Sequence, residues 1–247
     1  MRIRLAITLA ILLTGPWSHG QGDDSPRSHT NFADLTLGVG SGQTNISTSY
    51  QHLWKFGNNK RLLMGVGMRM NGFFASDANM ITAPARIVKG ETGPAALFKK
   101  SIPQYIDTAF FPTAQAYSIN FLMAIAYQIT DDFQVGFNID VIGASFGAER
   151  SGTYINRNNP TGIYSSPVRG APTGFNLLLV GENDLGSLNS EFYVTYAIDE
   201  RWSLKGGVQH SFLEFTTTTK VQQYPESNDR FRITPTVACL GVVYTIH

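Results

Sequence analysis

The chain has 247 residues, with 19 basic and 18 acidic side chains and a formal net charge of +1. This near-neutral balance gives no support for nucleic-acid binding, which needs a strongly basic surface. The single cysteine, Cys239, excludes an internal disulfide and a multi-cysteine metal site. No spacing of His, Asp or Glu suggests a bound metal, and we expect no cofactor.

The N terminus has the parts of a secretory signal. Two arginines precede an apolar run over residues 5–13, which is too short to span a membrane as a helix. Small residues then occupy the two positions that define a cleavage site. We therefore expect a signal peptide at residues 1–20, a polar spacer at 21–30 and one barrel domain at 31–247.

The stretch from Tyr117 to Val141 carries the strongest secondary-structure signal. Its odd positions are apolar or aromatic as far as residue 129, while the even positions between them are mostly small or polar. The alternation resumes at Phe133, after two aspartates. A period of two over this length indicates two strands joined by a tight turn.

The length of the apolar face in this stretch indicates a membrane. Tyr117 and Tyr127 are separated by roughly 33 Å along a strand, which spans an apolar band of roughly 25 Å when the strand is tilted. The alternative is a soluble β-sandwich, whose strands are usually about five or six residues long. Aromatic residues at both ends are typical of the girdles that flank a lipid-facing belt. The expected girdle residues are Tyr50, Trp54, Tyr117, Tyr127, Tyr196, Trp202 and Tyr244.

The same alternation predicts an all-β transmembrane antiparallel up-and-down β-barrel. The expected strands cover residues 33–40, 44–56, 62–71, 117–130, 133–141, 188–198, 202–215 and 231–246. Short turns are expected at 57–60, 131–132 and 199–201, and longer connections at 75–113, 151–187 and 218–229, with a short first connection at 41–43. Short turns on one side and long loops on the other are typical of outer-membrane barrels, in which the long loops are extracellular.

Two places leave alternatives open. The strand that begins at Trp202 loses its phase near His210, which a β-bulge or emergence from the lipid belt would explain. The run from Phe175 to Val180 does not alternate, so we favour a loop packed into the barrel mouth. If that run instead pairs as part of a further hairpin, the barrel would have ten strands rather than eight.

A resemblance becomes specific at the C terminus. Gly241, Tyr244 and Ile246 resemble the C-terminal assembly signal of outer-membrane barrels, with an aromatic three residues after the glycine and a hydrophobic residue two beyond. The wider pattern resembles the uncharacterised "outer membrane protein β-barrel" and porin-like families of Gram-negative bacteria. The resemblance implies a location in the cell outer membrane and contact with the barrel-assembly machinery, outer-membrane lipid and lipopolysaccharide. It implies little chemistry, because such families share architecture more than function.

If the apolar residues face lipid, the opposite faces line the lumen. The interior of an eight-stranded barrel is just wide enough for side chains to fill, and buried charges of both signs should pair. We therefore expect a polar plug, with a narrow charge-lined pore as the alternative. The expected lumen residues are Asp34, Lys55, Arg69, Asp140, Glu191, Lys205 and Arg232.

The expected function is non-catalytic: a monomeric barrel with a structural or binding role, or a small porin-like channel. Basic and aromatic residues in the connection 75–113 suit contact with lipopolysaccharide or a ligand, but we favour an ordinary loop packed by its own apolar residues. The alternative is a lipid-modifying enzyme such as a lipid A deacylase, in which His and Ser stand two apart on one strand. His210 and Ser211 are adjacent here and should point to opposite faces, so we expect no catalytic residues.

Overall fold

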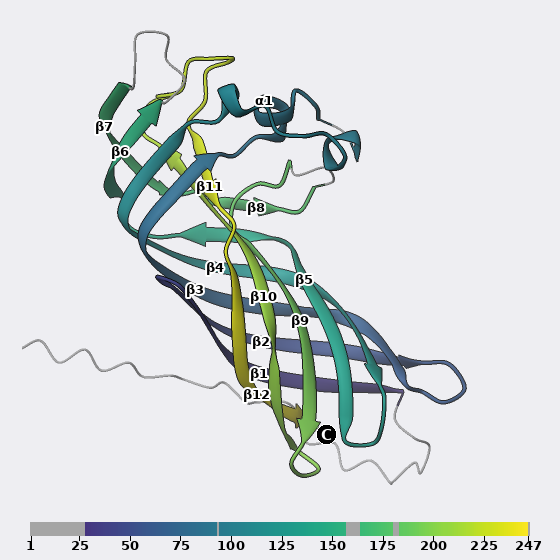
Figure 1. The fold of residues 1–247 in the computed structure, drawn as a ribbon. Coiled ribbons are helices and arrows are strands. Elements are labelled where there is room, and N and C mark those ends of the chain that lie inside the picture. Colours follow the sequence, from purple (N-terminus) through teal and green to yellow (C-terminus); the bar gives the residue numbers. More distant parts are fainter. Residues whose placement is uncertain (1–27, 93, 157–163, 180–182, 247) are drawn as a thin grey trace, which may run out of the picture.

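The computed structural model describes residues 28–92, 94–156, 164–179 and 183–246. The predicted signal peptide and most of the spacer lie outside the described residues. Eight strands pair antiparallel with their chain neighbours, and β1 pairs with β12 to close the ring (Figure 1). These strands are β1(His29–Gly40), β2(Gln43–Phe56), β3(Leu62–Thr82), β4(Thr108–Gln128), β5(Phe133–Phe146), β9(Leu188–Ala197), β10(Trp202–Thr217) and β12(Thr236–Ile246). The predicted eight-stranded transmembrane barrel is therefore confirmed.

The outer wall of this ring is apolar, and its inner wall is mostly polar with a small apolar cluster that includes Leu53, Leu63 and Leu122. Along β4, Ile119, Phe121, Met123 and Ile125 are exposed, whereas the residues between them are buried. Hydrogen-bonded strands keep the alternation in step, because partners in an antiparallel pair point to the same face. No helix in the described ranges is long and apolar enough to cross a membrane.

A charge in the middle of the apolar belt is expected to be costly. Replacing Met123, which is 58% exposed, by arginine should lower the free energy of unfolding by about 2–4 kcal/mol, the cost of that charge at the midplane of a bilayer. The same change at Ile129, beside a short turn, should cost about 0–1 kcal/mol. Urea unfolding of the protein in phospholipid vesicles measures both values, and equal costs at the two sites would contradict a lipid-facing belt.

A second, smaller ring is stacked on the barrel at the end opposite the short turns. Six strands close it in the order β3, β4, β6, β7, β10 and β11. We call it the outer ring; its additional strands are β6(Arg150–Asn156), β7(Tyr164–Pro172) and β11(Arg230–Ile233). The connections expected at 75–113 and 151–187 thus contain strands, and the strand expected at 231–246 is divided into β11 and β12. α1(Ala85–Lys89), η1(Pro94–Leu97) and η2(Pro103–Tyr105) cover this end of the molecule (Figure 1).

The interior of the outer ring is an apolar core, unlike that of the barrel below. Phe111 and Phe215 are fully buried there with ring centroids 5.2 Å apart, and Tyr154 lies 6.1 Å from Phe231. The Tyr154 hydroxyl donates to Asp107 Oδ2 at 2.6 Å. Burial raises the pKa of Asp107, and this hydrogen bond opposes the rise. The outer ring is therefore filled by side chains.

The loss of phase in β10 marks the passage from one ring to the other. Odd-numbered residues face inward throughout, but they change from polar Lys205 and Gln209 to apolar Leu213 and Phe215. The pairing register with β12 and β11 is continuous across this point, so emergence from the lipid belt explains the pattern and a bulge in β10 does not. The register shift lies instead in β5, where Val141 is the extra residue opposite β4.

The run from Phe175 forms a short strand, β8(Phe175–Leu177), rather than an unpaired loop. It pairs with β5 above the shift at Val141, and a bridge joins Leu177 to Leu185. Asn176 is fully buried and donates to Asn120 Oδ1 at 2.7 Å inside the barrel. The segment therefore packs into the barrel mouth and adds no strand to the ring of eight, while Val180 lies outside the described residues.

Candidate functional site in the barrel lumen

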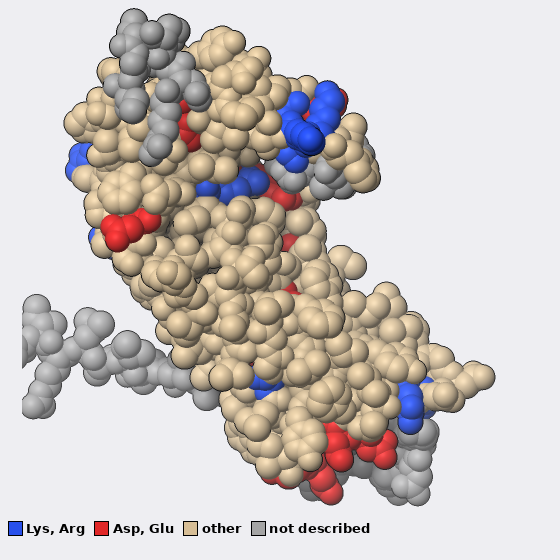
Figure 2. All heavy atoms as spheres, in the orientation of Figure 1, with Lys and Arg blue, Asp and Glu red and all other residues tan. Residues whose placement is uncertain are grey.

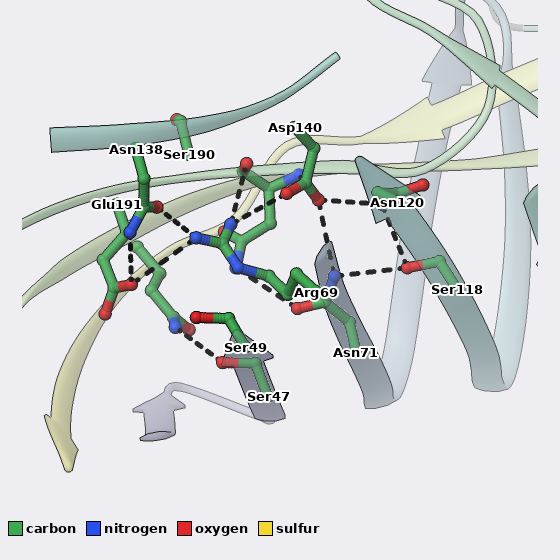
Figure 3. A network of polar contacts seen from close by, with 12 residues as sticks. Ser47, Ser49, Arg69, Asn71, Ser118, Asn120, Asn138, Asp140, Ser190 and Glu191 are labelled. Carbon is green, nitrogen blue, oxygen red and sulfur yellow. Dashed lines mark hydrogen bonds and ion pairs between the residues drawn. The ribbon is translucent and has the colours of Figure 1, made fainter. Parts of the chain in front are cut away.

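Buried charges from five strands meet inside the barrel. They are Asp34 of β1, Arg69 of β3, Asp140 of β5, Glu191 of β9 and Lys205 of β10, all among the predicted lumen residues. Each occupies an inward position of its strand, and strand tilt brings side chains far apart in sequence to one level. We call these five residues and their hydrogen-bond partners the lumen network; Figure 3 shows the part of it around Arg69, Asp140 and Glu191.

Arg69 is the centre of the lumen network. Its Nη1 donates to Asp140 Oδ1 at 3.0 Å and to the carbonyl of Asn189 at 3.1 Å. Its Nη2 donates to Asn138 Oδ1 and lies 3.7 Å from Glu191 Oε2. The guanidinium thus binds two carboxylates on different strands, as its forked geometry allows. This arrangement joins β3 to β5 and β9 across the lumen.

Amide side chains complete the coordination of Asp140. Asn120 donates to Asp140 Oδ2 at 2.7 Å and Asn71 at 3.4 Å, and the backbone N–H of Asn189 donates to the same oxygen at 3.0 Å. A buried carboxylate has several lone pairs to satisfy, which explains the number of asparagines around it. Sequence analysis did not name these asparagines as site residues, although their inward-facing positions in the strand alternation could have identified them.

Lys205 joins Glu191 to the third carboxylate of the network, Asp34. Its Nζ lies 3.0 Å from Glu191 Oε1 and 3.2 Å from Asp34 Oδ1, and it sits over the Tyr193 ring at 5.2 Å. The Tyr193 ring occupies the space that a side chain at Gly136 would need, so a glycine there lets the ring cross the lumen. Cys239 contacts Glu191 Oε1 through its thiol at 3.5 Å.

Side chains also fill the lumen between the network and the outer ring. Asn45 donates to Gln209 Oε1 at 2.9 Å, and Ser211 donates to Asn189 Oδ1 at 3.1 Å. A cavity of only about 20 Å³, the space of one or two water molecules, is lined by Asn45, Asn189, Ser211 and Phe73 among others. The apolar core of the outer ring follows directly. Polar side chains and then this apolar core thus occupy the interior beyond the lumen network.

The lumen is open at the end with the short turns. A cavity of about 740 Å³, here called the vestibule, reaches from the turns inward to Asp34, Gln51, Tyr193 and Lys205. Lys55, another predicted lumen residue, lines its wall. Asp199 stands at its mouth, where the backbone N–H groups of Arg201 and Trp202 donate to the carboxylate and lower its pKa.

Arg232 is not in the lumen. It lies on β11, where its Nη2 donates to Glu214 Oε2 at 3.0 Å. Arg230 binds both oxygens of the same carboxylate, each at 2.8 Å. Sequence analysis missed Glu214 and Arg230 because Glu214 holds an outward position in β10, where parity gives no reason to expect a buried charge. This cluster ties the outer ring to the segment at Asp184, whose carbonyl accepts from both arginines.

The predicted girdle residues lie on the outer wall. Trp54, Tyr127, Tyr196, Trp202 and Tyr244 lie near the turn end of the barrel, and Tyr50 lies midway along β2. Tyr117 lies near the outer end, with ring centroids 5.9 Å from Phe74 and 5.8 Å from Phe146. Of the remaining sequence signals, Gly241 and Ile246 lie with Tyr244 on the closing strand β12. Their role in assembly stays a prediction.

The adjacent pair His210 and Ser211 is divided between the two faces of β10. His210 is exposed and its Nδ1 lies 2.8 Å from Thr236 Oγ1, whereas Ser211 is buried in the lumen. The two side chains therefore cannot act as nucleophile and base in one site.

No family model matches the chain, and no curated protein does. Among solved structures, it is similar to Ail, the attachment invasion locus protein of Yersinia pestis, with 8% identity, coverage of 88% of this chain and 95% of that chain, and a TM-score of 0.31. It is similar to a major outer membrane protein from Thermus thermophilus, with 11% identity, coverage of 89% and 100%, and a TM-score of 0.34. A de novo designed transmembrane β-barrel gives 8% identity, coverage of 88% and 95%, and a TM-score of 0.30. At these identities the likeness concerns the fold alone.

Proposed function

We propose that this protein is a non-conducting, non-catalytic barrel of the cell outer membrane that presents its outer ring as a binding surface. Support for the location comes from the apolar outer wall, the polar lumen and the predicted export signal. Outer-membrane barrels have their short turns in the periplasm, so the short turns and the vestibule would face the periplasm and the outer ring the exterior.

The lumen network is the observation that carries the proposal. The Arg69 guanidinium and the Lys205 ammonium join carboxylates on β1, β5 and β9 across a narrow interior. An ion moving through the barrel would have to break these buried pairs, which leaves uncompensated charges and is strongly unfavourable. The solid core of the outer ring adds a second barrier.

Conductance measurements test the proposal directly. The refolded mature protein, inserted in planar lipid bilayers, is expected to give no unitary current steps above background at moderate voltage. A heat-modifiable mobility shift of the same sample on gels shows that the barrel is folded. Reproducible unitary steps from the folded protein would overturn the non-conducting assignment in favour of the small porin-like channel.

The binding surface consists of the outer ring and the helical segment above it. Phe98 is 90% exposed and Tyr224 is 61% exposed, and the Tyr224 ring packs against Tyr105. Figure 2 shows basic side chains gathered over α1 at this end of the molecule. Exposed aromatic and basic side chains on a rigid support suit an anionic glycolipid or another surface ligand.

A lipid-modifying enzyme is the alternative. It would need a nucleophile and a base on one face, whereas His210 and Ser211 lie on opposite faces of β10. Deletion of the gene should leave lipid A acylation unchanged in mass spectra. A shifted acylation pattern, restored by the wild-type gene and not by a Ser211→Ala variant, would favour the enzyme.

A further inference from the structure

The outer wall of the molecule becomes polar where β3 and β4 pass from the barrel into the outer ring (Figure 1). Two consecutive residues are exposed in each strand at this level, Ser76 and Asp77 in β3 and Pro112 and Thr113 in β4. In a regular strand one residue of each pair would point inward. The interruption of the alternation therefore adds polar side chains to the outside of the wall.

A hollow of about 610 Å³ lies at this level, here called the wall hollow. Phe74, Ser76 and Thr113 line it from β3 and β4. The tip of the β1–β2 hairpin closes one side at Gly42, whose carbonyl accepts from the backbone N–H of Ser76 at 2.9 Å. Arg150, at the start of β6, lines the other side. It is the only charged residue among the described residues that line the wall hollow.

Hydrogen bonds hold the Arg150 guanidinium above the aromatic girdle. Gln115 Oε1 accepts from Arg150 Nη2 at 2.7 Å, and Gln115 Nε2 donates to the Tyr117 hydroxyl. Within the described ranges no carboxylate pairs with Arg150, and its Nη1 has no hydrogen-bond partner. The neighbouring carboxylate of Glu149 is bound instead to Arg169, at 3.0 Å. The positive charge at the wall hollow is therefore uncompensated, and the guanidinium is oriented to bind an anion.

The wall hollow lies at the level of lipid headgroups. Tyr117 belongs to the row of aromatic rings formed with Phe74 and Phe146 on the outer wall. Gln115 is two residues beyond Tyr117, which is about 5 Å higher on a tilted strand. The headgroup region extends about 5–7 Å beyond each face of the hydrocarbon core. An anionic headgroup whose acyl chains lie against the apolar wall would therefore meet Arg150.

We propose that the wall hollow binds a phosphate group of an outer-leaflet glycolipid of the lipid A type. The planar fork of Arg150 matches the geometry of phosphate oxygens. The hydroxyls of Thr44 and Thr113, which line the same hollow, are donors for phosphate or sugar oxygens. The volume of the wall hollow exceeds that of one phosphate group, which favours a phosphorylated sugar over a simple phospholipid headgroup. This inference rests on the proposed location in the outer membrane and adds a lateral site to the binding surface at the tip.

Native mass spectrometry of the mature protein in detergent micelles tests the site. Lipid A with two phosphate groups is the probe, and one molecule per barrel is expected to stay bound. Lipid A without its phosphate groups should bind at least about tenfold more weakly, because charged hydrogen bonds supply the affinity. Phosphatidylglycerol should also bind more weakly. Equal retention of either lipid would overturn the proposal, and so would displacement of lipid A by an equal concentration of inorganic phosphate, which would indicate a site for a free anion.

Variants locate the binding at Arg150. Arg150→Met should weaken the binding of lipid A about tenfold. Gln115→Glu keeps the shape of the side chain but places a carboxylate against the guanidinium, so it should weaken lipid A binding as much while the barrel stays as stable as the wild type. Arg169→Met removes a neighbouring arginine that lies outside the wall hollow, and should change binding by less than about twofold. Unchanged binding in Gln115→Glu would contradict the site, and an equal loss in Arg169→Met would show general charge attraction instead.

Membrane fractionation separates a failure of this site from a failure of the proposed function. If the protein is recovered with the outer membrane but Gln115→Glu binds lipid A as the wild type does, the wall hollow is not a lipid site and the proposed function stands. If the protein is absent from the outer-membrane fraction, both are overturned.

Discussion

Replacing Arg69 by methionine is expected to lower the free energy of unfolding by about 3–5 kcal/mol, because it leaves Asp140 and part of Glu191 buried without their cation. Methionine keeps much of the side-chain volume, so the loss reports charge and hydrogen bonding more than packing. Urea unfolding of the protein in phospholipid vesicles, followed by tryptophan fluorescence, measures the change.

Two further variants test whether this cost comes from breaking the buried ion pair rather than from removing a positive charge anywhere. Arg86→Met removes a cation from an ion pair with Glu226 in which both side chains are about half exposed, and should cost less than about 1 kcal/mol. The double variant R69M/D140N removes both partners of the buried pair, so its cost should be smaller than the sum of the two single costs. An additive double variant would show that Arg69 and Asp140 do not act as a pair.

Replacing Phe111 by alanine is expected to cost about 3–5 kcal/mol, the usual loss for a fully buried aromatic side chain. Phe111 packs against Phe215 from the opposite side of the outer ring, and the space it leaves is lined by rigid strands that cannot collapse into it. Unfolding of the vesicle-bound protein measures this cost, and near-ultraviolet circular dichroism should show loosened aromatic packing. Phe98→Ala, at an exposed site, should stay within about 0.5 kcal/mol. A small cost at Phe111 would mean that the outer ring has no fixed core.

Strand parity predicts the barrel well because lipid and lumen impose opposite chemistry on the two faces of every strand. The alternation around Met123 and Phe137 therefore identified both the strands and the belt. The same rule failed beyond residue 75, since in the outer ring the apolar residues face inward, as in a soluble barrel. Ser76 and Asp77 are both exposed where β3 passes from the barrel into the outer ring. The alternation of buried and exposed residues is therefore interrupted at this point of the strand.

The lumen network was predictable in membership more than in geometry. Parity placed Arg69 and Asp140 inside, but their contact joins residues 71 positions apart and depends on strand tilt and stagger. Arg232 was assigned to the lumen because the sequence shows no break between β11 and β12 apart from one proline. The vestibule follows from the turns and termini that surround it, and no local pattern indicates an enclosed volume.

Three strands, β3, β4 and β10, run without interruption from the barrel into the outer ring. An outer ring joined by a flexible linker could rotate relative to the barrel. Here the hydrogen-bond ladders of the barrel continue into the outer ring, so the two must tilt together. A force applied to the outer ring is therefore transmitted directly to the barrel.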